Sequence, residues 1–441
     1  MFFKKIPLLL LLLSIAGISK AQQLQDSVLT LQQCVDIAIK NNLTVKLSET
    51  QVERDRIAWK QTRENLLPTL NGNASQTLSN GRSQDPTTYN YVNQQINIGQ
   101  YSLNSSVILF NGLSMVNSIK QNSLAYQAGK MDFQQVKDLT TLNIISLYLQ
   151  VLSSEDQLTQ ANFQFNGSKI NLDRETILNN AGSVAPADYY NIKGTHSSDA
   201  LTVINAKNAV ITAKLNLLEA MNVPFKKDVQ LVRLTADQVP VKYDQSPNQI
   251  YATALSDLAL VKAADLRVKS AQSQVKAARG RLYPTLSLGG SIGTNYSSTA
   301  SANFSNQFRN NYNYGPTLNL QIPILNYFQN RNNIAIAKIN LEDAQNTNTN
   351  TQVQLKQQIE QAHANMLTSY ERYAVLLDQI TAYQEAFNAQ EIKFNSGVIT
   401  ADIFVIAKNN LDAANVSLIN ARYDYLIRTK ILDYYQGKLN F

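Results

Sequence analysis

The sequence predicts a mainly α-helical protein with a transmembrane β-barrel, built from a tandem repeat. Residues 66–70 read LLPTL and residues 282–286 read LYPTL, and each motif follows about 35 residues of helix-like sequence. After each motif the apolar residues change from helical spacing to the two-residue alternation of a strand. Farther along the chain, apolar residues recur every seven positions, which is typical of coiled-coil helices. Helices and membrane strands therefore alternate along one chain.

The first element, residues 1–21, is predicted to be a secretory signal peptide. A short basic start, MFFKK, precedes the apolar run IPLLLLLLSIAGIS, and SKA places small residues at positions −3 and −1 of a cut before Gln22. A retained N-terminal anchor is the alternative. After residue 21, no stretch approaches the 18 consecutive apolar residues that suggest a membrane-spanning helix.

The charge of the chain gives little support to a nucleic-acid partner, and we expect none. The sequence has 39 basic and 32 acidic residues, a net charge of +7, and removal of the three signal lysines leaves +4. No basic block accompanies this small excess.

The single cysteine, Cys34, lies in the amphipathic pattern LTLQQCVDIAIKNN, so we expect a buried structural thiol.

Three segments recur in the same order, 214 to 216 residues apart, which indicates a tandem duplication. The pairs are LLPTLNGNAS (66–75) with LYPTLSLGGS (282–291), LNSSVILFN (103–111) with LNLQIPILN (318–326), and AGSVAPADYY (181–190) with NSGVITADIF (395–404). We therefore expect two repeats after the signal, residues 22–246 and residues 247–441.

A pair of β-strands is expected in each repeat, within residues 67–112 and 283–326. Each strand has roughly ten residues, apolar on one face and small and polar on the other, as in a strand between lipid and water. The apolar or small positions are Leu70, Gly72, Ala74 and Leu78; Tyr101, Leu103, Val107 and Leu109; Leu286, Leu288, Gly290, Ile292 and Tyr296; and Tyr312, Tyr314, Leu318, Leu320, Ile322 and Ile324. A soluble sandwich is the alternative. The uncharged polar face and the long loops at 79–98 and 297–311 favour the membrane.

Four strands cannot close a barrel by themselves, because known membrane barrels begin at about eight strands. An open edge in lipid would leave backbone groups without hydrogen-bond partners, at a cost of several kcal/mol each. The strands must therefore close with further copies of the chain. Two copies would give eight strands and a filled interior, whereas three would give twelve strands and a wider lumen.

Long helices make up most of the remaining chain. We expect them at 31–65, 113–181 and 187–223, and again at 247–281, 328–394 and 400–436. The two shorter helices of a repeat together match the long one in length, so they could pack end to end along it. Two series with seven-residue spacing, separated by NSGV, indicate an antiparallel coiled-coil hairpin. They are Ile359, Met366, Tyr373, Ile380, Phe387 and Phe394, and then Phe404, Leu411, Leu418, Tyr425, Leu432 and Leu439.

With these elements in place, the chain resembles the TolC-like outer membrane efflux proteins over essentially all of residues 22–441. The resemblance is carried by LTLQQCVDIAIKNN, the repeated PTL, the helix restarts after LFNG and PILN, and SGVITADIFVIAKNNLDAANVSLINARYDYL. It implies a trimer in the outer membrane of a Gram-negative bacterium, with a 12-stranded barrel continued by a periplasmic tube of twelve helices. It also implies a passive exit duct for drugs, small molecules or proteins, docked to a periplasmic adaptor and an inner-membrane pump.

The resemblance also suggests two sets of site residues at the hairpin ends. The tips that would meet the adaptor map onto 181–188 and 396–402, with Gly182, Ser183, Val184, Gly397 and Val398 as contact candidates. They could equally be turn residues only. The closed end of the tube, where the best-known family member has aspartates, aligns with Ile403 and Ile406. Phe394 and Ile399 lie nearby in sequence, and Asp402 is adjacent, so an apolar gate and an acidic gate both remain open.

An enzyme and a non-conducting receptor are the competing classes. The sequence has two histidines, His196 and His363, without a Cys/His cluster of metal-ligand spacing, a phosphate-binding loop or a dinucleotide fingerprint. We therefore expect no catalysis, cofactor or metal, and expect both histidines to be packing or surface residues. A trimeric outer membrane receptor or structural protein would use the same helices but would need a filled lumen. The small polar strand face favours an open one.

Overall fold

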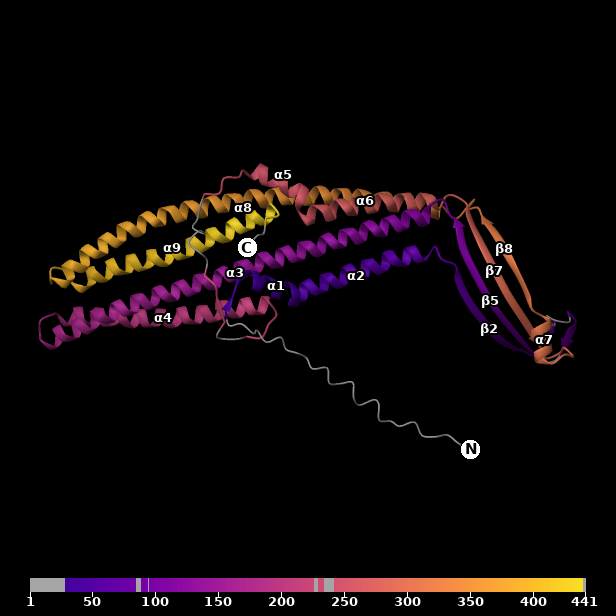
Figure 1. Cartoon of the computed structure of the whole chain (residues 1–441), viewed down its shortest axis with the longest axis horizontal. Helices are drawn as coiled ribbons and strands as arrows, with labels where there is room; N and C mark the ends of the chain where they lie inside the picture. The colour runs from indigo at the N-terminus through magenta and orange to yellow at the C-terminus, as the bar shows by residue number, and fades with distance from the viewer. Residues whose placement is uncertain (1–27, 85–88, 94, 226–228, 234–241, 439–441) are drawn as a thin grey trace, which may run out of the picture. The chain divides into compact units, whose positions relative to one another are not determined.

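The computed structural model describes residues 28–84, 89–93, 95–225, 229–233 and 242–438 (Figure 1). The predicted signal peptide lies outside the described residues. The chain forms two compact units, each of which draws on both predicted repeats. The hairpin unit comprises Met1–Lys46, Val136–Tyr251 and Gln358–Phe441, and the strand unit comprises Leu47–Gln135 and Ala252–Gln357.

The strand unit contains an antiparallel four-stranded sheet in the order β2-β5-β7-β8. These strands span Thr69–Ser79, Ile96–Phe110, Thr285–Ser297 and Asn313–Gln321, so both expected strand pairs are confirmed. The two loops have structure that the sequence reading did not anticipate. The first contains a small hairpin of β3 (Arg82–Gln84) and β4 (Tyr91–Asn93), and the second contains helix α7 (Phe304–Asn310).

The pairing register places most of the large apolar residues of the four strands on one face, whereas Ile96, Ile98 and Ile108 of β5 lie on the other. Leu103 of β5 lies between Gly72 of β2 and Ile292 of β7, and Leu288 of β7 lies opposite Leu318 of β8. Because side chains alternate along a strand, the intervening residues form the other face. That second face includes Asn71, Asn73, Ser75, Ser102, Asn104, Ser287, Ser291, Thr317 and Asn319. The two-faced sheet predicted from the sequence is therefore confirmed.

The helices also follow the predicted order. The long helices α3 (Ser114–Asn180) and α8 (Gln329–Asn395) have 67 residues each, and both run through the two units. The helices that return from them, α4 (Pro186–Ala220) and α9 (Ala401–Tyr435), have 35 residues each and belong to the hairpin unit. Equal lengths in the two halves are what a tandem duplication predicts.

The helix before each strand pair is interrupted, whereas the sequence pattern predicted a continuous one. Residues 31–65 form α1 (Leu31–Asn41) and α2 (Leu43–Glu64), and residues 247–281 form α5 (Pro247–Asp257) and α6 (Ala259–Gly280). Asn42 at the first break is extended, and its side chain donates to Ala220 O at 2.9 Å and accepts from Thr44 N at 2.8 Å. Leu258 at the second break is extended and 4% exposed. Tertiary contacts therefore override helix propensity at these positions.

The main core of the hairpin unit surrounds Tyr148. Strand β1 (Val28–Leu29) pairs in parallel with β6 (Gln230–Leu231), and the hydroxyl of Tyr148 donates to Val232 O beside this pair at 2.6 Å. Cys34 is fully buried in the same cluster, and burial raises the pKa of its thiol to about 12. The expectation of a buried structural thiol is confirmed.

Two glycines bring a strand-to-helix turn against the end of a helix in the strand unit. Gly112, between β5 and α3, has a φ of +63°, and a Cβ there would lie 2.2 Å from the carbonyl oxygen of Gly280 at the end of α6. A Cβ on Gly280 would lie 2.6 Å from the carbonyl oxygen of Gly112. This approach joins the turn after β5, in the first repeat, to helix α6 of the second repeat.

Helices in the described parts of the chain lack an apolar stretch long enough to cross a membrane.

Candidate functional site: the strand wall and the hairpin ends

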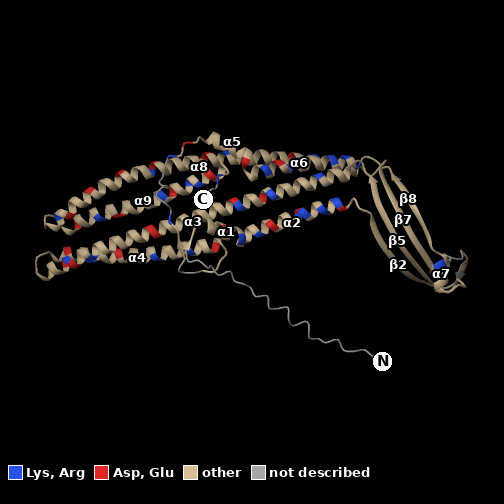
Figure 2. Cartoon of the chain, in the orientation of Figure 1, with Lys and Arg blue, Asp and Glu red and all other residues tan. Residues whose placement is uncertain are grey.

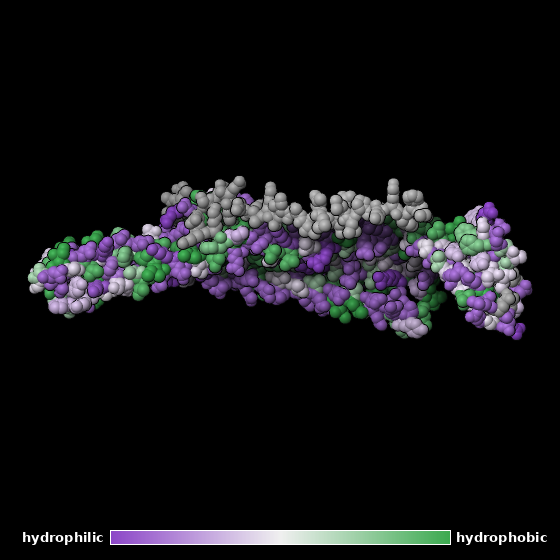
Figure 3. All heavy atoms as spheres, turned by 90° about the horizontal axis from the view of Figure 1, so that it is seen from below, coloured by the Kyte–Doolittle hydropathy of each residue, from purple (hydrophilic) through white to green (hydrophobic). Residues whose placement is uncertain are grey.

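The two faces of the sheet differ in polarity but share a lack of charge. The sequences of β2, β5, β7 and β8 contain no Asp, Glu, Lys or Arg, and Figure 2 shows these strands without charged residues while the helices carry many. Large apolar side chains are exposed on the apolar face, including Leu70 at 73% and Leu318 at 65%. In the view of Figure 3, hydrophobic residues (green) and hydrophilic residues (purple) both lie at the surface, at the strand end of the molecule as well as along the helices. An exposed apolar face is suited to lipid, and a face of Asn, Ser and Thr is suited to water.

The tips of the two helix hairpins have the same backbone geometry. Gly182 and Gly397 both have a φ of +70°, which favours glycine. In the first tip, Ser183 N donates to Leu178 O at 2.9 Å and Gly182 N to Asn179 O at 3.0 Å; in the second, Val398 N donates to Lys393 O and Gly397 N to Phe394 O. Each long helix thus ends in a Schellman motif. Gly182, Ser183, Gly397 and Val398 are exposed, and Val184 is partly exposed.

The five predicted gate residues do not lie in one environment. Phe394 is 7% exposed and stacks on Phe404 at 4.5 Å between ring centroids, and Ile399 packs against the same cluster. Ile403 and Ile406 are 42% and 59% exposed. Within one chain, therefore, the Phe394 ring is buried in packing contacts, whereas Ile403 and Ile406 are exposed; the gate assignment of these residues stays a prediction.

Asp402 acts in the first turn of α9. The side chain of Thr400, with the backbone of Asp402 and Ile403, donates hydrogen bonds that lower the pKa of the Asp402 carboxyl. A carboxylate at a helix N-terminus also interacts favourably with the helix dipole. These contacts give Asp402 a local role as a helix-start residue.

The ends of the two hairpins pack against each other within one chain. Ile192 of α4 lies in one buried cluster with Phe394 of α8 and Ala401 and Phe404 of α9. The carboxylate of Asp188 accepts a hydrogen bond from Ala401 N at 3.2 Å, which joins the starts of α4 and α9.

Farther from the tips, a buried charge cluster connects the same helices. Lys408 of α9, 7% exposed, lies 3.0 Å from a carboxylate oxygen of Asp199 of α4 and 2.6 Å from one of Asp412 of α9. Burial raises the pKa of the Asp412 carboxyl, and the hydrogen bond and charge of Lys408 oppose that rise. A buried lysine with two acidic partners is thus electrically compensated.

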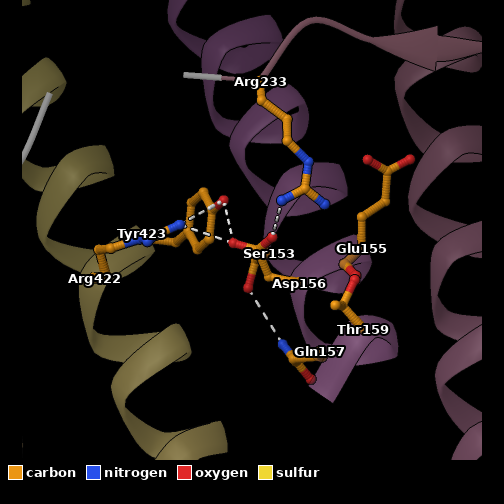
Figure 4. A network of polar contacts seen from close by, with 8 residues as sticks. All are labelled: Ser153, Glu155, Asp156, Gln157, Thr159, Arg233, Arg422 and Tyr423. Carbon is orange, nitrogen blue, oxygen red and sulfur yellow. Dashed lines mark hydrogen bonds and ion pairs between the residues drawn. The ribbon is translucent and has the colours of Figure 1, made fainter. Parts of the chain in front are cut away.

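A third connection centres on Asp156 of α3 (Figure 4). One oxygen of its carboxylate accepts from Arg422 and from the hydroxyl of Tyr423, both of α9, at 2.8 Å each. The other accepts from Arg233, just after β6, at 2.7 Å. Next to it, Gln157 donates to Asn420 of α9 at 2.9 Å. Asp156 therefore links the first hairpin to the second and to the segment that joins the repeats.

The sequence reading missed these polar links between hairpins. Lys408 could have been noticed, because it follows Phe404 by four residues and precedes Leu411 by three, which places a lysine on the apolar stripe of α9. No comparable signal marks Asp156, since its partners are far away in sequence.

His196 has a packing contact, and each histidine lies within hydrogen-bond distance of one oxygen atom. His196 stacks on Phe165 at 4.6 Å between ring centroids, and its Nδ1 lies 3.2 Å from the hydroxyl of Ser168. The Nε2 of His363 lies 3.1 Å from Gln245 O. Among the described residues, no group of three or more His, Cys, Asp and Glu side chains could hold a metal ion.

A charge-free two-faced sheet attached to long helix hairpins defines a subunit of an outer membrane channel. The family model described as "Outer membrane efflux protein" matches residues 34–223 and 250–437, and the chain belongs to this family. It is therefore an outer membrane protein of a family of transport channels. One matched segment lies in each of the two repeats expected from the sequence.

Individual relatives agree with this assignment. The chain is 24% identical over 456 residues to the outer membrane protein TolC of Escherichia coli K12, covering 99% of this chain and 87% of TolC. A crystal structure of CusC superposes with a TM-score of 0.80 at 17% identity, covering 92% of this chain and 91% of that one. The CmeC outer membrane channel of Campylobacter jejuni gives a TM-score of 0.77 at 18% identity, covering 92% and 86%. The resemblance seen in the sequence is confirmed.

Proposed function

We propose that this protein is the passive exit duct of a tripartite efflux or type I secretion system. The observation that carries the proposal is the sheet, with one uncharged polar face and one apolar face in a single register. With the apolar face toward lipid, the face of Asn, Ser and Thr lines a water-filled lumen. A non-conducting receptor would need that lumen filled. Single-channel conductance in a planar bilayer tests the proposal, and a folded protein that never conducts would contradict it.

Closure of the barrel requires further copies of the chain. In the described sheet β2 and β8 each pair with one strand, so each leaves an edge that lipid cannot satisfy. We infer a homotrimer, whose twelve strands enclose a wider lumen than the eight strands of a dimer. The joint between β8 of one copy and β2 of the next would repeat the joint between β5 and β7 within a chain.

The internal repeat gives the register of that joint. Moving the β2 residue of the pair Leu70↔Ser105 by 216 positions and the β5 residue by 215 yields Leu286↔Leu320, which is the observed β7–β8 pair. The same shifts turn the β5–β7 pair Asn104↔Ser291 into Asn319↔Ser75 between copies. Both residues lie on the polar face, so the shifted register keeps both faces of the sheet continuous.

The turn after β8 supports a joint between copies. In the first repeat the turn at Gly112 packs against the end of α6, as described above. The corresponding Tyr327 of the second repeat is 97% exposed, and Leu67, after the corresponding helix α2, is 63% exposed. We propose that these surfaces meet between neighbouring copies, with the same order of elements as inside the chain.

We further propose that the hairpin tips dock a periplasmic adaptor, through which an inner-membrane pump supplies the transported substrate. Exposed Val398 and the tight turn at Gly397 support this assignment. Gly397→Val should abolish efflux and leave trimers intact, because its φ of +70° disfavours a β-branched residue. Deleting residues 82–94, in a loop expected outside the cell, is the matched control and should spare efflux. The opposite pattern would reverse the proposed orientation.

For the gate, we propose that Ile403 and Ile406 close the periplasmic end as apolar rings, which can block a narrow pore by dewetting. Their exposure supports this, as does the helix-start role of Asp402. Conductance should then rise in Ile403→Ser and be insensitive to trivalent cations. Strong cation block that disappears in Asp402→Ala would instead support an acidic ring.

The proposed organisation of the chain is a signal peptide at 1–21 followed by repeats at 22–246 and 247–441. The two family matches, which begin and end near these limits, support the division. N-terminal sequencing of the mature protein tests the cut before Gln22.

A further inference from the structure

Helix α7 lies at the end of the sheet where β7 enters its loop (Figure 1). Phe304 and Phe308, four residues apart, contact Tyr101 of β5 at 6.2 and 5.8 Å between ring centroids. Phe304 also contacts Tyr296 of β7 at 5.3 Å. Tyr101 and Tyr296 both belong to the apolar face, because Tyr101 pairs with Ala74 and Tyr296 follows Ile292 by four residues. The helix therefore lies on the side that the proposed barrel turns toward lipid.

Polar contacts fix α7 in this position. Gln307, 3% exposed, accepts from Ser297 N at 2.9 Å and donates to Ser297 O at 2.9 Å, at the end of β7. The hydroxyl of Thr294 donates to Phe308 O at 2.9 Å. Asn303 caps the start of the helix, where its side chain accepts from Asn306 N. The second half of α7 is therefore hydrogen-bonded to β7.

An apolar groove of about 440 Å³ runs along the sheet beside α7. Residues of three strands line it, among them the small Gly72 and Ala74 of β2 beside Leu103 and Ile292, and we call these strand residues its floor. Phe308 and Tyr312, which line it from outside the strands, are called its wall. The residues that line the groove carry no charge, and its volume is within the range of small-molecule sites.

We propose that this groove binds one acyl chain of a membrane phospholipid, with Phe308 of α7 holding the chain against the sheet. The occupant follows from position, since the groove is continuous with the face that contacts the bilayer and lies at its loop end. The opposite side of α7 carries Asn306 and Arg309, as expected for a short helix at the membrane interface. The inference rests on the proposed orientation of the barrel.

Native mass spectrometry of the full-length trimer tests the proposal, with palmitoyl-oleoyl phosphatidylglycerol added before detergent exchange. The wild-type protein should retain up to one lipid per chain. Ala74→Phe fills the floor and Phe308→Ala removes the wall, so each should reduce retained lipid at least threefold. Leu288→Phe, on the apolar face of β7 but outside the groove, is the matched control and should retain lipid as the wild type does.

Equal lipid retention in the wild type, the two groove variants and the control variant would overturn the proposal. A control variant that loses as much lipid as the groove variants would overturn it too. Cross-linking of Ser75→Cys to Asn319→Cys in the same preparations reports whether the barrel closes. A closed barrel without groove-dependent lipid would refute the groove and leave the proposed duct intact, whereas a failure to close would count against the duct itself.

Discussion

Lys408 has a buried ammonium group whose compensation depends on carboxylates of two helices. Removing one partner from a buried ion pair leaves an uncompensated charge, which typically costs about 3 to 5 kcal/mol. Its neighbours on α9, Phe404 and Leu411, are 1% and 7% exposed, so solvent cannot take the place of the lost partner. The cluster should therefore be the most sensitive polar point between the two hairpins.

We expect Lys408→Met to destabilise the hairpin unit by about 3 to 5 kcal/mol at neutral pH. Thermal unfolding followed by circular dichroism measures the change. The control is the triple variant Lys408→Met, Asp199→Leu and Asp412→Leu, which removes all three charges and should recover most of the loss. A triple variant as unstable as the single one would show that packing, rather than charge, explains the effect.

The stability that Lys408→Met loses should depend on pH in a defined direction. Burial raises the pKa of the Asp412 carboxyl in the folded state. The folded state therefore binds a proton at Asp412 more readily than the unfolded state does. Stability from this group is therefore greatest at low pH and falls as the pH rises through the folded pKa. Without Lys408 the pKa should rise further. The stability loss of Lys408→Met should accordingly shrink between pH 7 and pH 5, and a loss that grows on acidification would contradict this account.

Cys34 should be chemically silent in the folded protein. Its thiol has a pKa raised to about 12 by burial, so very little reactive thiolate exists at pH 8. Iodoacetamide labelling at pH 8, followed by mass spectrometry, should be slow in the native trimer and fast in denaturant. Rapid labelling of the native protein would mean that the core around Tyr148 opens readily.

At the scale of elements, the approach of Gly112 to Gly280 connects the two repeats. Gly112→Ala should destabilise the strand unit by roughly 2 kcal/mol or more, because the new Cβ would overlap a backbone oxygen and the positive φ adds strain. Gly290→Ala in β7 is the matched control, since a Cβ there meets nothing within 4 Å. Both are measured as the temperature at which the purified trimer dissociates. Equal effects would show that the close approach has no energetic role.

The element order could be predicted from the sequence because it depends on local periodicity. The long helix expected at 113–181 is observed at Ser114–Asn180. The alternation of polar and apolar residues placed the strand faces correctly, except that Leu109 lies at a β-bulge and Tyr312, Ile322 and Ile324 lie outside β8. The break at Asn42 was missed because it is fixed by Ala220, 178 residues away. Helix α7 was missed because seven residues carry too little periodicity to separate them from a loop.

The candidate site residues also divide into those that a local sequence pattern identifies and those that depend on contacts between distant segments. The tip glycines were identified from a repeated motif, and their positive φ is a local property of the turn. The prediction that Phe394 belongs to the gate rests on its position in sequence, whereas its stacking on Phe404 is a tertiary contact that the sequence does not show. Asp156 escaped notice because its contacts join residues more than 70 positions apart, which no single-sequence pattern records.

At the scale of the whole molecule, the account depends on how copies of the chain join. One chain supplies four strands with two open edges, and the internal repeat supplies the register in which those edges would meet. The apolar face then becomes continuous around a barrel and the polar face becomes continuous around a lumen. The transport function, the lipid groove and the hairpin gate all presuppose this closure.

Cross-linking across the proposed joint tests that closure most directly. In a Cys34→Ala background, Ser75→Cys and Asn319→Cys should lie opposite each other in neighbouring copies, with Cβ atoms about 5 Å apart. The in-chain counterpart Asn104→Cys with Ser291→Cys is the positive control, and Asn71→Cys with Asn319→Cys, four residues out of register and about 13 Å apart, is the negative control. A short thiol cross-linker should give a denaturation-resistant band of three chains for the Ser75 and Asn319 pair alone. A band of two chains without three, or linkage of the Asn71 pair in its place, would contradict the account.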